Sequence, residues 1–313
     1  MSSTKKVRAG VAGIGAMGKN HARIYSELES SELTAIFDLN KDLANELASQ
    51  YGGKVVDSME EFISLVDAAT IATPTVTHRE IGCALLNAGK HVLMEKPISD
   101  SVDDATALID LAYEKGLVLQ VGHIERFNPV MAQLESHLDN PKFIESHRLS
   151  PFPNRSMDIG VVLDLMIHDL EIILHLVDTP IAKIDATGIA VLTKREDIAN
   201  ARITFENNCV ANITASRISP EKMRKIRVFQ NDAYLSLDYQ DQSGWIYRKE
   251  GLAIAREKVE VEKGEPLKSE LASFIDCASQ GLKPRVSGQQ GADALDVALQ
   301  ITRIIDEANS TNQ

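Results

Sequence analysis

Apolar and polar positions alternate along the first 122 residues in a rhythm that predicts strands and helices in turn. Short apolar runs, such as KVRAGVAGIG and LTAIFDLN, are followed by amphipathic stretches, such as AMGKNHARIYSELE and KDLANELASQYG. The same order continues through AATIATPT, HREIGCALLNAGK, HVLMEKPI, SVDDATALIDLAYEKG and LVLQVGH. Strands that alternate with helices of this length form right-handed βαβ units around a parallel sheet. We therefore predict an α/β chain whose residues 1–122 form a doubly wound Rossmann domain.

The pattern changes after residue 122, where apolar and polar residues begin to alternate one by one. Four stretches show this period of two: IANARITFE, CVANITASRI, RKIRVFQ and AYLSLDY. The connections Glu206-Asn207-Asn208 and Gln230-Asn231-Asp232 have the composition of hairpin turns. We predict that residues 123–313 form an α+β domain with a largely antiparallel sheet. The stretches from LKSELASFIDCASQG to ALDVALQITRIIDEAN have helical periodicity, but the pattern does not say which domain they join.

Composition narrows the classes of function. The 33 Lys and Arg residues against 45 Asp and Glu residues give a formal charge of −12, which disfavours binding to nucleic acid or to an anionic membrane. Cys83, Cys209 and Cys277 lie far apart and lack neighbours at metal-ligand spacing, so neither a disulfide framework nor a metal site is expected. Arg8 and several glycines interrupt the apolar N-terminal run, and an apolar stretch of membrane-spanning length is missing from the sequence. We expect a cytoplasmic protein.

A glycine motif opens the first predicted helix. Gly13-x-Gly15-x-x-Gly18 follows the apolar strand VRAGVA, and Asp38 lies twenty residues after Gly18 at the end of the next apolar run. Glycines permit a tight turn and close backbone approach, the helix N-terminus accepts a pyrophosphate, and the carboxylate receives ribose hydroxyls. The order of strand, loop, helix and acidic residue predicts a dinucleotide site rather than an ordinary turn. The expected loop contacts are Gly13, Gly15, Ala16, Met17 and Gly18.

Asp38 also indicates which dinucleotide binds. Its charge would repel the 2′-phosphate of NADP, and an arginine does not follow directly. We therefore predict NAD as the cofactor. Asn40 and Lys41 lie close enough in sequence to keep NADP open as an alternative.

Two further groups carry chemistry. Glu95-Lys96-Pro97 ends the predicted strand HVLME, at the edge where an open α/β sheet presents groups to its ligand. Asp164 and His168, in the apolar stretch VVLDLMIHDLEI, are spaced i, i+4 and therefore share one face of a helix. Taken alone, the first group could be a solvated strand end and the second a satisfied half-buried pair.

Together these motifs resemble the glucose–fructose oxidoreductase/inositol dehydrogenase/MocA (Gfo/Idh/MocA) family of nicotinamide enzymes. The resemblance rests on AGVAGIGAMGKNHARIY, ATPTVTH, EKP and the later Asp-x-x-x-His, and covers nearly the whole chain. It implies that Lys96, Asp164 and His168 meet at the nicotinamide. The chain departs from the family in having Gly160-Val161 where Gly-Gly is common. The remaining cofactor contacts that we predict are Thr73, Pro74, His78, Glu95 and Lys96, although a structural role for His78 remains open.

Oxidation of a secondary alcohol gives these three residues distinct roles. The hydroxyl proton must leave while a hydride leaves the same carbon, which requires a base and a cation beside the developing alkoxide. We predict His168 as the base because imidazole titrates near neutral pH. Lys96 would hydrogen-bond the substrate oxygen, and Asp164 would orient or share the proton. An exchange of roles between Lys96 and His168 remains open.

The segment VGHIERFNP suggests a substrate class. With FIESHRLSPFPNRSMDIGVVLDLMIHDLEI it resembles a bacterial subgroup that oxidises the 3-hydroxyl of UDP-N-acetylglucosamine. That resemblance implies a UDP-sugar substrate and coupling to a PLP-dependent aminotransferase that makes the 3-amino sugar of a modified lipid A. Forked contacts from Arg126, Arg148 and Arg155 could hold the diphosphate, unless these side chains are simply solvated. The predicted substrate contacts are Lys96, His123, Arg126, Asn128, Arg148, Arg155 and His168.

Two other functions remain alternatives. One is a dehydrogenase of a free cyclitol or hexose, which would use the same catalytic motifs. The other is an NAD-binding sensor without turnover, against which the presence of Lys96, Asp164 and His168 together argues. The open antiparallel sheet favours face-to-face association, and the resemblance to the family implies a homodimer or homotetramer.

Overall fold

The computed structural model describes residues 6–152 and 159–311. They form two compact units, each with its own sheet. Unit 1 contains the described residues up to Phe127 together with Glu265–Ala292, and unit 2 contains those of Asn128–Gly264 and those from Asp293 onward.

Unit 1 is built on a six-stranded sheet with the order β3-β2-β1-β4-β5-β6. Every pairing in it is parallel, and the order reverses between β1 and β4, as in a doubly wound fold. The strands are β1 (Val7–Ala12), β2 (Ser31–Phe37), β3 (Lys54–Val56), β4 (Ala68–Ile71), β5 (His91–Glu95) and β6 (Leu119–Gly122). The predicted Rossmann architecture is confirmed.

Helices cover the sheet of unit 1 in two groups. They are α1 (Gly18–Glu27), α2 (Lys41–Tyr51), α3 (Met59–Leu65), α4 (His78–Asn87), α5 (Val102–Lys115) and α8 (Pro266–Gln280). Side chains of α1, α2 and α8 share one apolar core with β1 and β2, while α4 and α5 pack against each other. Asn40, Ser58 and Ser101 each accept a backbone N–H at the start of α2, α3 and α5, which explains where these helices begin.

Helix α8 joins unit 1 although 143 residues separate it from the end of β6. Its apolar stripe, Leu267, Leu271, Phe274 and Ile275, is buried in the core that contains Val7 and Ile24. The structure therefore divides the chain differently from our sequence-based domains of 1–122 and 123–313. Unit 1 extends to Phe127 and takes a second segment from the C-terminal region, because the apolar face of α8 is buried beside α1.

Unit 2 is built on an eight-stranded sheet with the order β14-β13-β12-β11-β7-β10-β9-β8. Its pairings are antiparallel except that of β7 with β10. The strands are β7 (Phe143–Leu149), β8 (Ile181–Ile189), β9 (Ile198–Phe205), β10 (Val210–Ser216), β11 (Met223–Phe229), β12 (Ala233–Asp238), β13 (Ser243–Glu250) and β14 (Ala253–Lys258). The largely antiparallel α+β character is confirmed, and the four strands read from period-two alternation are β9 to β12.

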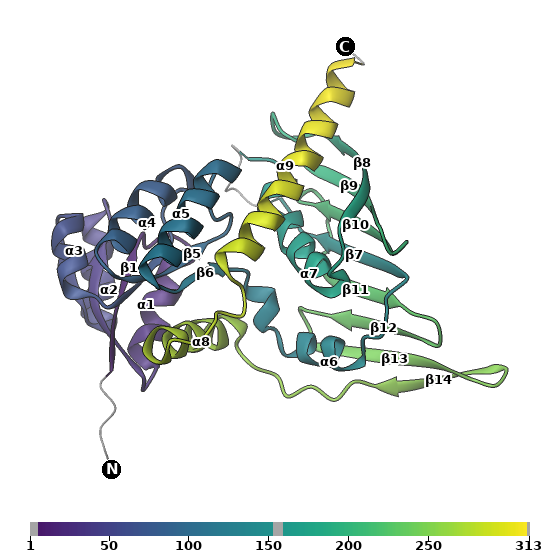
Figure 1. The fold of residues 1–313 in the computed structure, drawn as a ribbon, viewed down its shortest axis with the longest axis horizontal. Helices are drawn as coiled ribbons and strands as arrows, with labels where there is room; N and C mark the ends of the chain where they lie inside the picture. Colours follow the sequence, from purple (N-terminus) through teal and green to yellow (C-terminus); the bar gives the residue numbers. More distant parts are fainter. Residues whose placement is uncertain (1–5, 153–158, 312–313) are drawn as a thin grey trace. The chain divides into compact units, whose positions relative to one another are not determined.

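Three helices and a π-helical turn cover one face of this sheet (Figure 1). They are α6 (Pro129–His137), the π turn Val162–Met166, α7 (Ile167–Val177) and α9 (Gly288–Thr311). Alternate residues of β9 and β10, including Ala201, Ile203, Ala211 and Ile213, point into the core beneath them. The intervening residues lie on the opposite face and are exposed or half-buried. This alternation is the physical basis of the strand predictions.

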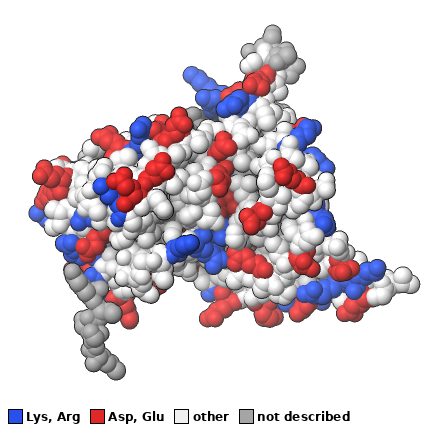
Figure 2. All heavy atoms as spheres, in the orientation of Figure 1, with Lys and Arg blue, Asp and Glu red and all other residues white. Residues whose placement is uncertain are grey.

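Acidic and basic side chains are interspersed on the molecular face shown in Figure 2. Among the described residues, no helix is both long enough and apolar enough to cross a membrane.

Candidate active site

The predicted cofactor residues of unit 1 follow the carboxyl ends of its strands. Gly13 follows β1, Asp38 follows β2, Thr73 lies just after β4, and Lys96 follows β5 directly. Because these strands are parallel neighbours in one sheet, their carboxyl ends meet at the same edge. Residues from four separate segments are thereby brought to one edge of the sheet.

The glycine loop is shaped by close backbone packing. Gly13 has φ +84°, and a Cβ atom there would lie 2.6 Å from the carbonyl oxygen of Ala72. A Cβ atom on Gly18 would lie 1.8 Å from the carbonyl oxygen of Gly13. By contrast, a Cβ atom on Gly15 would meet nothing within 4 Å. The outer two glycines therefore serve the turn, and Gly15 faces open space that a pyrophosphate can approach.

Helix α1 begins directly after this loop, and no side chain caps its first turn. The N–H groups at a helix N-terminus have no partners within the helix and carry a partial positive charge. An anionic pyrophosphate is the ligand that such a terminus binds. The loop, the uncapped helix and Asp38 together fit NAD.

Asp38 is held in place by the backbone on both sides. The N–H of Ile14 donates to Oδ2 at 2.7 Å, and the N–H of Asn40 donates to Oδ1 at 2.7 Å. A carboxylate has about four acceptor positions, so both oxygens can still receive ribose hydroxyls. The contact with Ile14 also ties the carboxylate to the glycine loop.

Replacing Asp38 by Ser should shift the cofactor preference toward NADP. The change removes a negative charge from the position that we expect to face a 2′-phosphate, and at short range this charge should disfavour NADPH by about 10- to 100-fold. Fluorescence titration with NADH and with NADPH measures the ratio of the two Kd values. Asp42→Ser, which removes an exposed charge from the first turn of α2, is the matched control. An unchanged ratio in Asp38→Ser would show that another group selects the cofactor.

The loop after β4 is fastened internally. The hydroxyls of Thr73 and Thr77 lie 2.7 Å apart, and the Thr77 N–H donates to the carbonyl of Pro74. Pro74 is exposed and Thr73 is half-buried. His78, the first residue of α4, is buried, with Nε2 3.0 Å from the Thr73 carbonyl and Nδ1 3.1 Å from the Pro97 carbonyl. Its ring therefore faces the protein backbone on both sides.

A buried polar row lies behind Lys96. Glu95 is 8% exposed; its Oε2 accepts the Lys96 N–H at 3.3 Å, and its Oε1 lies 3.0 Å from Nε2 of His21. Nδ1 of His21 lies 3.2 Å from the hydroxyl of Thr70, which lies 2.7 Å from the hydroxyl of Tyr25. When Tyr25 donates to Thr70 and Thr70 donates to Nδ1 of His21, the ring carries its proton on Nε2 and donates it to the carboxylate of Glu95. Burial raises the pKa of Tyr25, which keeps the phenol protonated as that donor.

The sequence motifs did not point to this row or to its neighbour Glu270. Glu270 lies on the otherwise apolar inner face of α8 and is completely buried. Burial, together with the charge of Glu95, raises the pKa of Glu270 well above its ordinary value. The signals in the sequence were a histidine on the inner side of α1 and a glutamate on the stripe that buries α8.

In unit 2, Asp164 and His168 lie at the start of one helical segment. Asp164 is in the π turn and is 6% exposed, whereas His168 is in the first turn of α7 and is half-buried. The i, i+4 spacing predicted a helix here; the structure instead begins the segment with one wider, π-helical turn. Such π turns inside helices are frequent at functional sites.

The entry into this segment is fixed from the loop before β9. A Cβ atom on Gly160 would lie 1.8 Å from Oε1 of Glu196, so only glycine leaves room for that carboxylate. The N–H of Val162 donates to Oε1 of Glu196 at 3.3 Å, and the N–H of Val161 donates to the Glu196 carbonyl. Burial raises the pKa of Glu196. A glycine is therefore needed at position 160, and the following Val161 does not prevent this packing.

Arg148 and Asp169 form a buried ion pair in unit 2. Nε of Arg148 lies 2.5 Å from Oδ2 of Asp169, and the Ser146 hydroxyl donates to Oδ1 of Asp169 at 2.6 Å. The two charged side chains are 4% and 2% exposed. Asp169 follows His168 in α7, so the pair fastens the helix that carries His168 to β7.

The other predicted substrate residues are placed as follows. His123 and Arg126 are buried in unit 1, at 1% and 3% exposure. Asn128 caps α6 by accepting the Val130 N–H, and its amide donates to the Tyr239 carbonyl at 3.0 Å. Arg155 lies outside the described residues.

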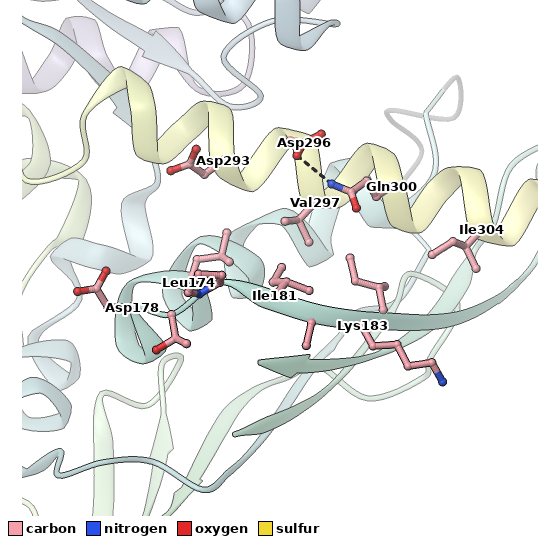
Figure 3. A pocket seen from close by; sticks show the side chains of 13 residues that line it. Leu174, Asp178, Ile181, Lys183, Asp293, Asp296, Val297, Gln300 and Ile304 are labelled. Carbon is pink, nitrogen blue, oxygen red and sulfur yellow. Dashed lines mark hydrogen bonds between the residues drawn. The ribbon is translucent and has the colours of Figure 1, made fainter. Parts of the chain in front are cut away.

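A separate pocket in unit 2 lies between the C-terminal end of α7, β8 and α9 (Figure 3). Its lining includes Asp178, Asp293, Asp296 and one cation, Lys183, and Asp296 accepts a hydrogen bond from Gln300 at 2.8 Å. Asp178 lies ten residues after His168, about 15 Å along a helix at 1.5 Å per residue. The excess of carboxylates disfavours a diphosphate there.

Comparison with known proteins identifies both halves of the chain. Residues 7–123 match the family model described as oxidoreductase family, NAD-binding Rossmann fold. Residues 128–236 match the Gfo/Idh/MocA C-terminal domain.

Two relatives match over nearly their whole length. UDP-N-acetylglucosamine 3-dehydrogenase of Acidithiobacillus ferrooxidans is 36% identical over 302 residues, covering 94% of this chain and 96% of the relative. Its solved structure has a TM-score of 0.93 at 35% identity, covering 97% and 99% of the two chains. Myo-inositol 2-dehydrogenase of Thermotoga maritima is 26% identical over 328 residues, covering 97% and 98%.

Levoglucosan dehydrogenase in complex with NADH and levoglucosan shares the fold, with a TM-score of 0.88 at 18% identity over 97% and 98% of the two chains. Unit 1 is an NAD-binding Rossmann domain, in agreement with the prediction from the glycine loop. The chain therefore belongs to the Gfo/Idh/MocA family of NAD(P)-dependent oxidoreductases that act on sugar and cyclitol hydroxyls.

Proposed function

We propose that this protein oxidises the 3-hydroxyl of UDP-N-acetylglucosamine to the 3-keto nucleotide sugar, with NAD as the oxidant. The observation that carries the proposal is the 36% identity, over nearly both full lengths, to an enzyme named for that reaction. The Lys96, Asp164 and His168 set is present in this chain and suits the oxidation of a secondary alcohol.

The proposal gives each of the three residues one task at the reacting carbon. His168 accepts the hydroxyl proton, Lys96 donates a hydrogen bond to the oxygen as its negative charge develops, and Asp164 orients the imidazole. Bound NAD supplies the acceptor for the hydride that leaves the same carbon. The Lys96 backbone is held by Glu95, and α7 is held by the pair of Arg148 and Asp169, so each reacting side chain stands on a fixed support.

The diphosphate of the substrate needs donors. Arg126, Arg155, His123 and Asn128 remain predicted contacts. Arg148 is committed to Asp169 in the described structure, which favours a role in supporting α7 over direct contact with phosphate.

A substrate panel tests the proposal directly. The purified protein is mixed with NAD and one of four compounds: UDP-N-acetylglucosamine, UDP-glucose, free N-acetylglucosamine or myo-inositol. NADH formation is followed at 340 nm, and an aminotransferase with its amino donor is added in parallel to remove the ketone. We expect turnover with UDP-N-acetylglucosamine, and mass spectrometry should detect loss of two hydrogens from the sugar.

The other outcomes separate the alternatives. Turnover of myo-inositol or another free polyol alone would replace the proposed substrate by a cyclitol or hexose. Tight NADH binding with no reduction in any mixture would favour a non-catalytic NAD sensor.

The chemistry of the product suggests what consumes it. A sugar ketone is a substrate for transamination, so we propose that a PLP-dependent aminotransferase acts next and forms a 3-amino sugar for lipid A synthesis. Coupling of this kind requires both enzymes in the same compartment, which we propose is the cytoplasm.

We also propose that the protein is a homodimer or homotetramer. On the sheet face away from the helices of unit 2, neighbouring aromatic rings form a continuous row with centroid distances of 5.7, 5.0 and 4.3 Å. The row consists of Phe143, Phe229, Tyr234 and Tyr247. Aromatic side chains are enriched at subunit interfaces. Light scattering coupled to size exclusion would give the mass of the assembly against 34.3 kDa for one chain.

A further inference from the structure

The buried side chain of His78 lies between two loops that we expect to contact the cofactor. The residue is 1% exposed, and its two ring nitrogens lie 3.0 Å from the Thr73 carbonyl and 3.1 Å from the Pro97 carbonyl. Thr73 belongs to the loop after β4, and Pro97 follows Lys96 at the end of β5. One side chain therefore touches both loops.

Both carbonyls are acceptors, and the number of N–H groups that the ring can offer them depends on its protonation. Burial lowers the pKa of His78, although the carbonyls of Thr73, Ile98 and Pro97 and the charge of Glu95 oppose that shift. A neutral imidazole has one N–H, so it donates to Pro97 in the Nδ1–H tautomer and to Thr73 in the Nε2–H tautomer. Each tautomer fastens one loop.

Both loops have a direct connection to the cofactor machinery of unit 1. The Thr73 loop packs against the glycine loop, because a Cβ atom on Gly13 would lie 2.7 Å from the Thr73 nitrogen. Pro97 directly follows Lys96 in the chain. The backbone N–H of Lys96 itself donates to the side chain of Glu95. A displacement of either loop would move a group that the dinucleotide or the substrate has to meet.

We propose that His78 is a positioning residue whose two tautomers serve the two loops in turn: through Thr73 it sets the affinity for NAD, and through Pro97 it sets the placement of Lys96. The second part rests on the proposed function of Lys96. Neither part requires His78 to touch the cofactor.

Two amide variants each keep one of the two hydrogen bonds of the ring and remove the other. In His78→Asn the amide nitrogen takes the position of Nδ1 and keeps the bond to Pro97. In His78→Gln it takes the position of Nε2 and keeps the bond to Thr73. A buried carbonyl that loses its donor typically changes an equilibrium by about 5- to 150-fold.

The expected results differ in direction. His78→Asn should weaken NADH binding by about 10-fold and leave kcat within about 3-fold of the wild-type value. His78→Gln should keep the NADH affinity and lower kcat by about 10-fold or more. Without cofactor, hydrogen exchange should become faster at Thr75–Thr77 in the Asn variant and at Lys96 and Ile98 in the Gln variant. His78→Phe should show both defects.

His91→Asn is the matched control. His91 begins β5, at the opposite end of the strand from Lys96, and its Nδ1 accepts the Val118 N–H at 3.0 Å, a bond that an Asn amide oxygen can replace. It should leave NADH affinity and kcat unchanged. NADH affinity and hydrogen exchange do not depend on the sugar, so a wild-type protein inactive toward UDP-N-acetylglucosamine would overturn the proposed function without affecting these two readouts.

Two outcomes would overturn the role of His78. One is a Phe variant with wild-type NADH affinity, kcat and exchange. The other is Asn and Gln variants that lose affinity and turnover in equal measure, which would show one general structural role in place of two separate contacts.

Discussion

Replacement of Lys96 by Met is expected to lower kcat by about 10²- to 10⁴-fold while NADH still binds with nearly its normal affinity. Met keeps most of the length and apolar volume of the side chain and removes only the ammonium. The groups that we predict to bind the dinucleotide, which are the glycine loop, the N-terminus of α1 and Asp38, remain unchanged. Steady-state kinetics with UDP-N-acetylglucosamine and fluorescence titration with NADH measure the two quantities separately.

A companion variant decides how the proton-transfer roles are divided. His168→Asn should lower kcat to a similar extent, and only the residue that acts as base should shift the lower limb of the pH profile of kcat/KM. Lys90→Met is the control for loss of a lysine, because Lys90 donates to the Val66 carbonyl in unit 1, before the start of β5. Normal turnover in Lys96→Met would refute the assignment of Lys96.

Replacement of Arg217 by Met should lower the free energy of unfolding by about 3–5 kcal/mol, because it leaves a buried carboxylate without its cation. Arg217 and Asp197 are both fully buried, with Nε of Arg217 2.9 Å from Oδ1 of Asp197. Arg217 also donates to the Ile159 carbonyl at 2.8 Å, just before the segment that carries Asp164 and His168. Urea unfolding at pH 7 measures the loss.

Asp197 also predicts an acid limb of the stability profile. Burial alone would raise its pKa, but the N–H groups of Leu192, Thr193 and Val191 and the guanidinium of Arg217 outweigh burial and hold the pKa of Asp197 well below its usual range. In the unfolded chain an aspartate has a pKa of about 3.9. The stabilisation is therefore fully present above that pH and is lost as the pH falls below it.

The variant Asp197→Asn tests the electrostatic origin of both effects. It should remove this acid limb, and in the double variant with Arg217→Met the second substitution should cost less than it does alone, since no buried charge is left uncompensated. Arg227→Met is the control, since Arg227 forms an exposed pair with Glu145 at 3.3 Å that is worth at most about 1 kcal/mol. A loss below about 1 kcal/mol in Arg217→Met would contradict the prediction.

The parts of the molecule that sequence analysis anticipated depend on near neighbours in the chain. Gly13 and Gly18, which shape one turn, lie only five positions apart, and Asp38 directly follows the next strand. The strands β9 to β12 follow from a period of two that is set by one buried sheet face. Local backbone preference and apolar periodicity suffice for such features.

Other features depend on segments that meet only in the folded chain. Three features join residues that lie between five and more than a hundred positions apart. They are the packing of α8 in unit 1, the pairing of Arg148 with Asp169, and the contacts of His78. In the sequence, the residues involved are ordinary polar or apolar residues that carry no sign of their partners. The partner of a buried polar group is selected by packing, and many partners satisfy the same local pattern.

The order of apolar runs and the glycine spacing were sufficient to predict the Rossmann sheet and the dinucleotide site, because backbone conformation and strand periodicity act over a few residues. The EKP and Asp-x-x-x-His motifs added a resemblance to the family that the comparisons confirmed. Tertiary structure alone decided which helix completes unit 1, which arginine is used in a buried pair and which histidine connects the two cofactor loops. Those choices depend on desolvation: a polar group removed from water must find a partner wherever the fold brings one, and chain order does not record where that is.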